Sequence, residues 1–339
     1  MPRGKNSTIP IVNSCNIPHR AVTVDFRSNC LICTCDGWLP VPVGTVEEFD
    51  SLEAVWNSTT AKILQQDIAD KKYTWCAVKH CGVDRHDNYR AHASLSINID
   101  DSCNLACPSC RRERIMIDSG PEFERKLSNV RRILTWLEKY QDPITITLSG
   151  NGDPLASHVI RPLFKEYQPR NTQKFILHTN GLLMRKQLAQ STLLSHIHWV
   201  NLSVDAGTAE TYQQVRRGGS WSVLLDNFEF LKEIGLNTHT TLKFAVQQSN
   251  YRDLDAFVAV CQHYGFHAHI HQLDDWGTWI AEPVATPDTW TLHNGTFLDH
   301  DVLNKNHSNY AECREKILEI KQKYTPSNVY VDDVILGKL

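Results

Sequence analysis

The sequence predicts an α/β fold, with a partial, TIM-like (β/α)6 barrel preceded by a small cysteine-rich domain. Short apolar runs alternate with longer amphipathic patterns from about residue 95 to residue 273, in six successive strand–helix periods. Parallel strands require crossovers of this kind. Cysteines gather ahead of this region, six of them between Cys15 and Cys81. An open doubly wound sheet is the alternative, although no G-x-G-x-x-G segment follows a predicted strand.

The first barrel strand is predicted at residues 94–99, and the helix after it, at 121–140, has the clearest pattern in the chain. Its apolar side chains recur at steps of three and four, at Phe123, Leu127, Val130, Leu134 and Leu137. The remaining strands are expected at 144–149, 174–179, 199–205, 239–246 and 267–273. The remaining barrel helices are expected near 159–168, 186–196, 221–234 and 253–264.

The segments on either side of the barrel have different patterns. A hairpin with its turn at Arg27–Asn29 is expected near the N-terminus, followed by one helix over residues 51–68. A further amphipathic helix is expected at 306–324. We therefore expect three parts, namely a cysteine-rich module at 1–90, the barrel at 91–282 and a C-terminal helical extension at 283–339.

Composition narrows the class of protein. The 339 residues are 41% hydrophobic and 22% charged, with a net charge of only -3, so nothing indicates a nucleic-acid surface. The N-terminal residues lack a signal-peptide pattern, and no apolar run reaches the roughly 18 residues of a membrane span. We expect a cytoplasmic protein without a membrane partner. Eleven cysteines in such a protein indicate metal binding more than disulfides.

Three cysteines occupy one short loop after the first barrel strand. Cys103, Cys107 and Cys110 have the spacing C-x3-C-x2-C. The C-terminal ends of barrel strands hold the active site in this architecture. Three thiolates can hold three irons of a [4Fe–4S] cluster and leave the fourth iron open for a small molecule. A zinc site would need a fourth protein ligand, and three unrelated buried cysteines are the remaining alternative.

The motif after a first strand resembles the signature of the radical SAM enzymes, with Ser109 in place of the usual aromatic residue before the third cysteine. The segment SGNGDPL resembles the family's glycine-rich motif, which contacts the methionine amino group of S-adenosylmethionine. The resemblance implies cofactor contacts for this motif at Gly150, Asn151, Gly152 and Asp153. Glycines allow a close approach of the backbone.

Later segments extend the resemblance over about residues 93–280. HTNG, which contains Asn180, ends the third strand, and LSVDAGTAETYQQVRRGGSW resembles the family's fourth-strand segment. The family places a serine and an aspartate there near the ribose and the methionine carboxylate, and a later arginine on the carboxylate. These positions correspond to Ser203, Asp205 and Arg216, with Arg217 as the alternative arginine. An arginine can grip a carboxylate through two parallel bonds.

The resemblance implies a cofactor set and an activity. The cofactors are a [4Fe–4S] cluster that binds S-adenosylmethionine and S-adenosylmethionine itself. The implied activity is that of a radical SAM oxidoreductase. Reductive cleavage yields methionine and a 5′-deoxyadenosyl radical, which removes hydrogen from a substrate C–H bond. An electron donor such as flavodoxin or ferredoxin is the implied partner.

The N-terminal cysteines resemble the SPASM/twitch type of auxiliary-cluster module, including its SLEAVWNS helix. The resemblance implies one auxiliary [4Fe–4S] cluster. The ligand set chosen for it is Cys15, Cys35, Cys76 and Cys81. Cys33 and Cys30 are alternatives to Cys35, and a zinc ribbon built from the same residues is the alternative site. Cys261 and Cys313 lie in helical patterns and are expected in the core.

The substrate is the least determined feature. The resemblance implies a sugar or cyclitol that is oxidised, dehydrogenated or epimerised, or a ribosomal peptide that is modified. We favour a small polar or carbohydrate-like substrate because no separate peptide-binding domain is evident in the sequence. A zinc-cysteine binding module without catalysis is the competing class. Side chains that could face the barrel lumen are His178, His269, His271, Asp274, Asp275, Trp276 and Trp279.

Overall fold

A computed structural model describes most of the chain. The described residues are 15–33, 39–77, 81, 89–279, 284–285, 291–292, 295–324 and 328–339. The chain divides into two units. The first comprises Met1–Ile99, Glu124–Thr147 and Arg170–Lys174. The second comprises Asp100–Phe123, Leu148–Pro169 and Phe175–Leu339.

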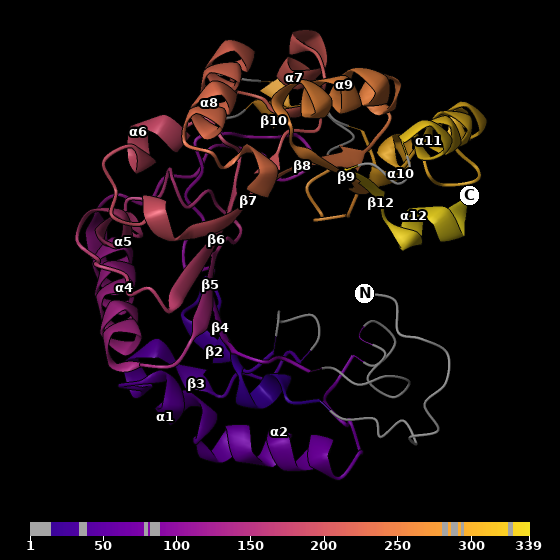
Figure 1. Ribbon diagram of the computed structural model, residues 1–339. Helices are drawn as coiled ribbons and strands as arrows, with labels where there is room; N and C mark the ends of the chain where they lie inside the picture. The colour runs from indigo at the N-terminus through magenta and orange to yellow at the C-terminus, as the bar shows by residue number, and fades with distance from the viewer. Residues whose placement is uncertain are drawn as a thin grey trace, which may run out of the picture. The chain divides into compact units, whose positions relative to one another are not determined.

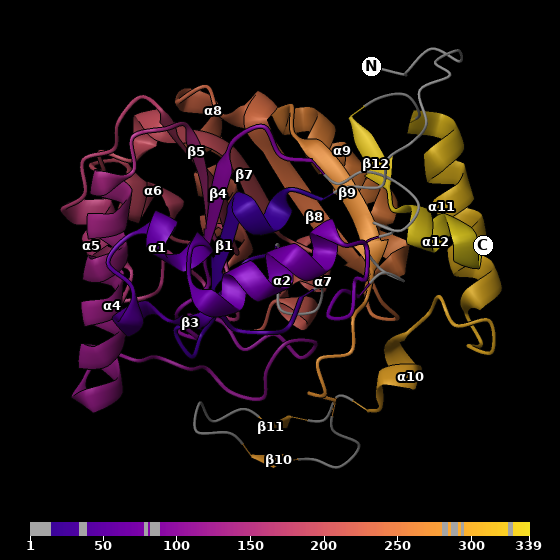
Figure 2. The ribbon, with the colours of Figure 1, turned by 90° about the horizontal axis from the view of Figure 1, so that it is seen from below.

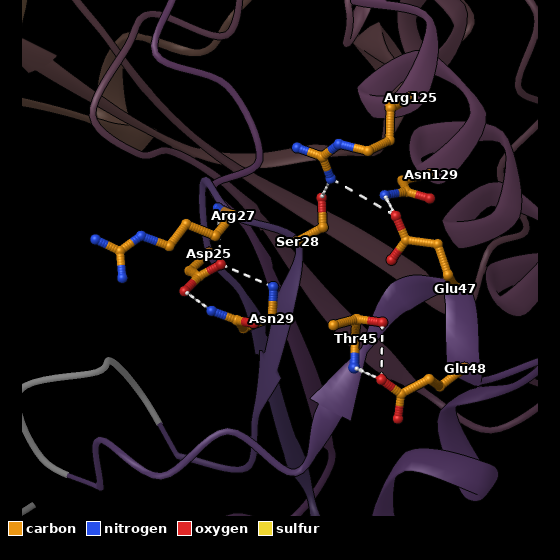
Figure 3. Close-up of polar contacts among 9 residues, drawn as sticks. All are labelled: Asp25, Arg27, Ser28, Asn29, Thr45, Glu47, Glu48, Arg125 and Asn129. Atoms are coloured by element: carbon orange, nitrogen blue, oxygen red, sulfur yellow. Dashed lines mark hydrogen bonds and ion pairs between the residues drawn. The ribbon is translucent and has the colours of Figure 1, made fainter. Parts of the chain in front are cut away.

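The first unit begins with the expected hairpin. Strands β1 (Ala21–Val24) and β2 (Asn29–Leu31) pair antiparallel. The turn between them contains Ser28 in the left-handed region, with φ of 68°. The Asp25 carboxylate accepts hydrogen bonds from the backbone N–H groups of Arg27 and Asn29, at 2.9 and 2.8 Å (Figure 3). This local network confirms the turn expected at Arg27–Asn29.

The sheet of this unit continues past residue 90. Strand β1 pairs in parallel with β4 (Ala93–Ile97), so the N-terminal hairpin and the first predicted barrel strand share one sheet. Strand β3 (Gly44–Thr45) lies beside β2, and β5 (Ile144–Leu148) lies beside β4. The partial barrel and a separate N-terminal domain therefore stay predictions, whereas the α/β fold with a mostly parallel sheet is confirmed.

The long helix α4 (Gly120–Lys139) confirms the strongest periodic pattern. Its fully buried Trp136 donates from Nε1 to the Phe49 carbonyl at 3.3 Å. Asn129 donates to the Glu47 carboxylate at 2.5 Å, and Arg125 donates to the Ser28 hydroxyl at 3.1 Å (Figure 3). These bonds tie α4 to the hairpin.

The single helix predicted at 51–68 was wrong. The chain forms α1 (Leu52–Trp56) and α2 (Thr59–Ala69) instead. The Ser58 hydroxyl accepts from the Ala61 N–H at 3.3 Å and so caps α2. The two residues at 57–58 end one helix and begin the next because their short polar side chains bond to nearby backbone groups.

The second unit contains the other parallel strands. They are β6 (Gln173–Thr179), β7 (Ile197–Ser203), β8 (Thr240–Val246) and β9 (His267–Gln272), in that spatial order. Helices α8 (Trp221–Glu233) and α9 (Leu254–Tyr264) lie along one side of β7, β8 and β9 (Figure 1). The expected helices near 159–168 and 186–196 are short, at α5 (Arg161–Lys165) and α6 (Met184–Leu188). Helix α7 (Ala209–Val215) was not predicted.

The strands of this unit have one apolar and one polar face. On β8, Leu242, Phe244 and Val246 are fully buried, and Phe244 packs against Phe257 of α9 with ring centroids 4.8 Å apart. The alternate residues of β8, including Lys243, are only partly buried. Alternation of this kind directs one face of the sheet into the apolar core and the other face away from it.

The C-terminal extension was predicted to be helical, but it also contains a strand. Helix α11 (Tyr310–Tyr324) is present, but β12 (Val329–Val331) pairs in parallel with β9 before α12 (Asp333–Lys338). Figure 2 shows α11, α12 and β12 beside one another. The expected core positions of Cys261 and Cys313 are confirmed, since their exposed fractions are 1% and 0%.

One short helix and two short strands lie between β9 and α11. Helix α10 spans Phe297–His300. Strands β10 (Val284–Ala285) and β11 (Thr291–Leu292) pair antiparallel with each other. Of the helices that the described ranges contain, none combines the length and the apolar character needed to cross a bilayer.

Candidate functional site

One cavity of about 230 Å³ in the second unit brings the three-cysteine loop to the ends of several strands. The cysteine thiols share it with residues that follow β5, β6 and β7. Its lining comprises Cys103, Leu105, Cys107, Cys110, Arg111, Ser149, Gly150, Asn151, Gly152, Asp153, His178, Thr179, Asn180, Ser203 and Arg216. Most of the residues proposed from sequence as a cofactor site therefore surround one space.

Backbone bonds hold the three-cysteine loop in place. Cys103 donates its N–H to the Ile115 carbonyl at 2.8 Å, and Ala106 donates to the Arg217 carbonyl at 3.1 Å. Cys110 donates to the Cys107 carbonyl at 2.9 Å, which closes the turn between the last two cysteines. The loop is thus fixed at both ends and in the middle without a regular helix or strand.

Two thiols of the three-cysteine loop, those of Cys103 and Cys107, are largely buried, and a positively charged side chain lies beside one of them. Burial raises the pKa of Cys103 to about 12 and also raises the pKa of Cys107. Metal ligation requires the thiolate form, and a positively charged group beside it offsets the cost of burial. The guanidinium Nη1 of Arg216 lies 3.7 Å from the Cys107 sulfur. The donor set, three sulfurs around a cavity, fits a cluster with one open iron.

A site for a single metal ion requires at least three ligating side chains close together. Within the described ranges, no three His, Cys, Asp or Glu side chains converge as a single-ion site would require. Sulfurs that bind one tetrahedral ion lie about 2.3 Å from it. A four-iron cluster is larger than one ion and spreads its ligands over separate irons.

The glycines of the SGNGDPL segment serve the packing of two loops. Gly150 has φ of 133°, a region that favours glycine. A Cβ on Gly152 would lie 2.3 Å from the Ser102 carbonyl oxygen. Asp153 donates its N–H to the same oxygen at 2.7 Å. The structure thus shows a close approach of this segment to the backbone just before Cys103, whereas the approach to the cofactor that the sequence indicated stays a prediction.

Asp153 lines the cavity but is 3% exposed, with its carboxylate engaged inside the protein. It accepts from the Thr179 hydroxyl and the Asn180 N–H, both at 2.7 Å, and from the Leu155 N–H at 3.0 Å. Burial raises the pKa of Asp153, and these hydrogen bonds oppose the rise. The geometry makes Asp153 a positioning residue that ties the end of β6 to the glycine loop.

Replacing Asp153 with Asn should destabilise the protein by about 1.5–3 kcal/mol, because the amide NH2 cannot accept the bonds made by one carboxylate oxygen. Urea unfolding followed by tryptophan fluorescence measures the loss. Asp118→Asn is the matched control, since Asp118 is exposed and its carboxylate accepts a hydrogen bond from the hydroxyl of neighbouring Ser119. Equal unfolding midpoints for the two variants would contradict the positioning role.

Arg216 and Asp205 form a buried ion pair. Nη2 of Arg216 lies 2.5 Å from Oδ2 of Asp205, and Oδ1 of Asp205 accepts from the Ala245 N–H at 2.8 Å. Burial opposes the charged form of Arg216, but the Asp205 carboxylate and Cys107 raise its pKa. Asp205 is 4% exposed and has φ of 58°. One carboxylate oxygen of Asp205 thus holds Arg216, which lines the cavity, and the other is bonded to the backbone of β8.

The alternative arginine has another role in the structure. Arg217 donates from Nε to the Ala106 carbonyl at 2.9 Å and so braces the three-cysteine loop. Asn180 donates from Nδ2 to the Asn104 side chain at 2.9 Å, which braces the same loop from β6. Ser203 lines the cavity at the end of β7.

Sequence reasoning missed Arg111. It is 8% exposed, donates to the Asp101 carbonyl at 2.8 Å and to the Asn151 carbonyl, and lines the cavity next to Cys110. It also lines a second cavity of about 460 Å³ with Ile115 and exposed Trp276. Its position directly after the third cysteine was the available signal.

The predicted lumen residues do not all meet at the site. His178 lines the cavity, and burial with the nearby Lys243 charge lowers its pKa to about 4. His269 and His271 lie on β9 with ring centroids 5.4 Å apart. The other predicted lumen residues are not among those that line the first cavity; they are Asp274, Asp275, Trp276 and Trp279.

In the first unit, four cysteines from separate segments interact. Burial raises the pKa of Cys15 to about 11 and of Cys76 to about 12, and repulsion from neighbouring thiols adds to both. The thiols that act on Cys15 are those of Cys33 and Cys81. The thiols that act on Cys76 are those of Cys81, Cys33 and Cys15. Cys35, the ligand chosen from sequence, lies outside the described residues.

Cys30 is set apart from this group. It is fully buried on β2, and its raised pKa reflects burial and the Asp25, Glu47 and Glu48 carboxylates. No other cysteine is among the causes of its shift. This separation argues against Cys30 as a fourth ligand.

Comparison with known proteins identifies a domain that covers just under half of the chain. The Radical SAM superfamily model matches residues 97–259. The chain therefore contains a radical SAM domain, and this family carries a [4Fe–4S] cluster and S-adenosylmethionine as cofactors. The matched residues include all three cysteines of the loop and every residue that lines the first cavity.

Particular relatives share this domain. Mycofactocin maturase MftC of Mycobacterium ulcerans (strain Agy99) is 28% identical over 182 residues, 53% of this chain and 47% of the relative. GTP 3′,8-cyclase of Peptoclostridium acidaminophilum is 26% identical over 181 residues, 53% of each chain. The chain spans about half the length of these curated relatives. Among solved structures, Streptococcus suis SuiB bound to precursor peptide SuiA aligns with a TM-score of 0.45 and 14% identity, covering 83% of this chain and 62% of SuiB.

Proposed function

We propose that the protein is a radical SAM enzyme that cleaves S-adenosylmethionine and takes hydrogen from a substrate C–H bond. The convergence of three thiols, the glycine loop and a buried arginine on one cavity supports this most directly. The cofactors supply the hard chemistry, in which one electron converts S-adenosylmethionine to methionine and a 5′-deoxyadenosyl radical that becomes 5′-deoxyadenosine on taking hydrogen. The electron comes from a donor of the flavodoxin or ferredoxin class.

The chain's own residues bind and orient these partners. Cys103, Cys107 and Cys110 hold the cluster. Gly150 and Gly152 shape the loop at the methionine end, while Asn151 and Ser203 offer polar groups to the bound cofactor. Arg216 remains charged beside Asp205 and presents a guanidinium to the methionine carboxylate. Asn180 holds the three-cysteine loop against the end of β6, and Asp153 holds the glycine loop there.

The direct test is anaerobic incubation of the cluster-reconstituted full chain with dithionite and S-adenosylmethionine. Chromatography should show 5′-deoxyadenosine that accumulates with time. Stoichiometric zinc without labile sulfide, and no 5′-deoxyadenosine, would show a zinc-cysteine binding module instead.

Arg216→Lys should weaken S-adenosylmethionine binding about tenfold or more, because the ammonium keeps the charge but loses the paired, charge-assisted bonds of the guanidinium. Arg217→Lys is the matched control and should bind nearly as well as the parent. Equilibrium dialysis with labelled S-adenosylmethionine measures both. The reverse order of effects would assign the carboxylate to Arg217.

We further propose that the first unit binds an auxiliary [4Fe–4S] cluster. The interaction among the thiols of Cys15, Cys33, Cys76 and Cys81 supports this set, with Cys33 in the place that sequence gave to Cys35. Buried thiols that repel one another are stabilised when a metal centre takes them as thiolates. Such a cluster suits oxidation because it can accept the electron left on a substrate radical.

The substrate class is open between two candidates. The carbohydrate-like substrate favoured from sequence gains no support from the named relatives, which are a maturase and a nucleotide cyclase. A peptide is the second candidate, and the maturase relative favours it. Turnover with a deuterated extract, followed by deuterium in 5′-deoxyadenosine, identifies the fraction that holds the substrate.

A further inference from the structure

A row of polar side chains crosses the sheet face opposite the apolar core of the second unit. Neighbouring strands place His178 beside Asn201, and Ser203 beside Lys243 and then His269. His178 and Asn201 are hydrogen bonded, with 3.2 Å between Nε2 and Nδ2. His178 and Ser203 also line the first cavity, which the proposed function assigns to the cofactors and which is called the cofactor cavity below. The row therefore begins at this cavity and runs away from it.

Lys243 lies in the middle of the row as a partly buried cation. Its ammonium is near enough to affect the pKa values of His178 and His271, and the carboxylates of Asp205 and Asp332 act on its own pKa. Burial lowers the pKa of Lys243, and the two carboxylates oppose that shift. Lys243 is thus surrounded by groups from four other segments of the unit.

Each of those neighbours is already engaged elsewhere. Asp205 pairs with Arg216, and Asp332 bonds to Nε2 of His269 at 2.8 Å. The His271 ring bonds to the Gln272 carbonyl at 2.9 Å. The Lys243 carbonyl accepts from the N–H groups of Val204 and Asp205, but across the part of the chain that the structure describes its side-chain ammonium makes no hydrogen bond or ion pair.

Burial removes part of the hydration of this ammonium, and the Asp205 and Asp332 carboxylates offset that loss through charge without a direct hydrogen bond. An anionic oxygen supplies the missing bonds through a charge-assisted contact. The neighbouring imidazoles of His269 and His271 can add hydrogen bonds to such a group. A carboxylate or phosphate fits this donor set, whereas a metal cation does not fit beside an ammonium.

We propose that Lys243, with His269 and His271, binds an anionic carboxylate or phosphate group of the substrate. This inference rests on the proposed function, because the row adjoins the cavity assigned to the cluster and S-adenosylmethionine. The anchored group would lie along β8 and β9, and the reacting carbon would then extend toward His178 and the cofactor cavity. The substrate's anion is therefore a recognition element and is not itself changed.

Pyridoxal 5′-phosphate labelling of the full chain tests the site directly. Its aldehyde condenses with a neutral lysine amine to give an imine and water, and borohydride fixes the product for peptide mapping. Lys243 should label early. An anion present at about ten times its dissociation constant should slow that labelling about tenfold by mass action. Exposed Lys232 on α8 serves as the internal reference and should show no protection.

The choice of protecting anion separates the two sources. Protection by inorganic phosphate alone indicates a phosphorylated substrate. Protection by acetate, or by a peptide with a free but not an amidated C-terminus, indicates a carboxylate. No protection by either, or equal protection by S-adenosylmethionine, would overturn the proposal.

Lys243→Arg provides the folding control, because it keeps the charge and removes only the reactive amine. Its remaining lysines should label at the parent rate. Since labelling requires no cluster, a chain that shows anion protection but never forms 5′-deoxyadenosine would contradict the proposed function and leave the anion site standing.

Discussion

Replacing Cys103, Cys107 and Cys110 together with alanine is expected to abolish 5′-deoxyadenosine formation and to remove about four irons per chain. The reason is that these three thiols are the protein's cysteines at the cofactor cavity, and an open iron needs the other three held by protein. Iron and labile sulfide analysis of anaerobically reconstituted protein measures the loss. About four irons, bound by the first unit, should remain.

Cys261→Ala is the matched control for this triple variant. Cys261 is 1% exposed within α9, and its loss removes a buried sulfur without touching the cavity. Its iron content and 5′-deoxyadenosine yield should equal those of the parent, even if its unfolding midpoint falls. A triple variant that keeps all its iron would contradict the ligand assignment.

Removing Cys76 and Cys81 together is expected to eliminate the auxiliary cluster and separate two half-reactions. 5′-Deoxyadenosine should still form, since the cofactor cavity contains neither residue. The oxidised product should not form, because the substrate radical has lost its electron acceptor. The measurement is the ratio of 5′-deoxyadenosine to product in protein shown by circular dichroism to be folded. Normal product yield would contradict the electron-acceptor role.

Cys33→Ala should lower auxiliary iron as the double variant does, whereas Cys30→Ala should not. Cys33 contributes to the raised pKa of Cys15 and Cys76, while Cys30 interacts with carboxylates. The two variants remove the same atoms three residues apart. Full iron in Cys33→Ala with loss in Cys35→Ala would restore the ligand chosen from sequence. A fall in solubility and in both half-reactions together would indicate a structural cluster.

Long periodic segments were predictable because their patterns are local. Helix α4 and strands β6 and β8 lie within a residue or two of their expected bounds. Short elements were not predictable from sequence. β12 has three residues, too few for alternation to be visible, and its pairing with β9 depends on a strand about sixty residues earlier. The break between α1 and α2 follows from capping by Ser58, which a run of helical pattern conceals.

The sequence by itself determined the chemistry of the site: three cysteines at one spacing, a glycine loop, and an arginine after the fourth predicted barrel strand. Only the tertiary structure decided which groups face the cavity. Asp205 and Asp153 read as ligand contacts in sequence, yet their carboxylates are buried and bond to Arg216 and to Thr179. A buried charge must find its partner within the fold, and that partner comes from a distant segment that no local pattern specifies.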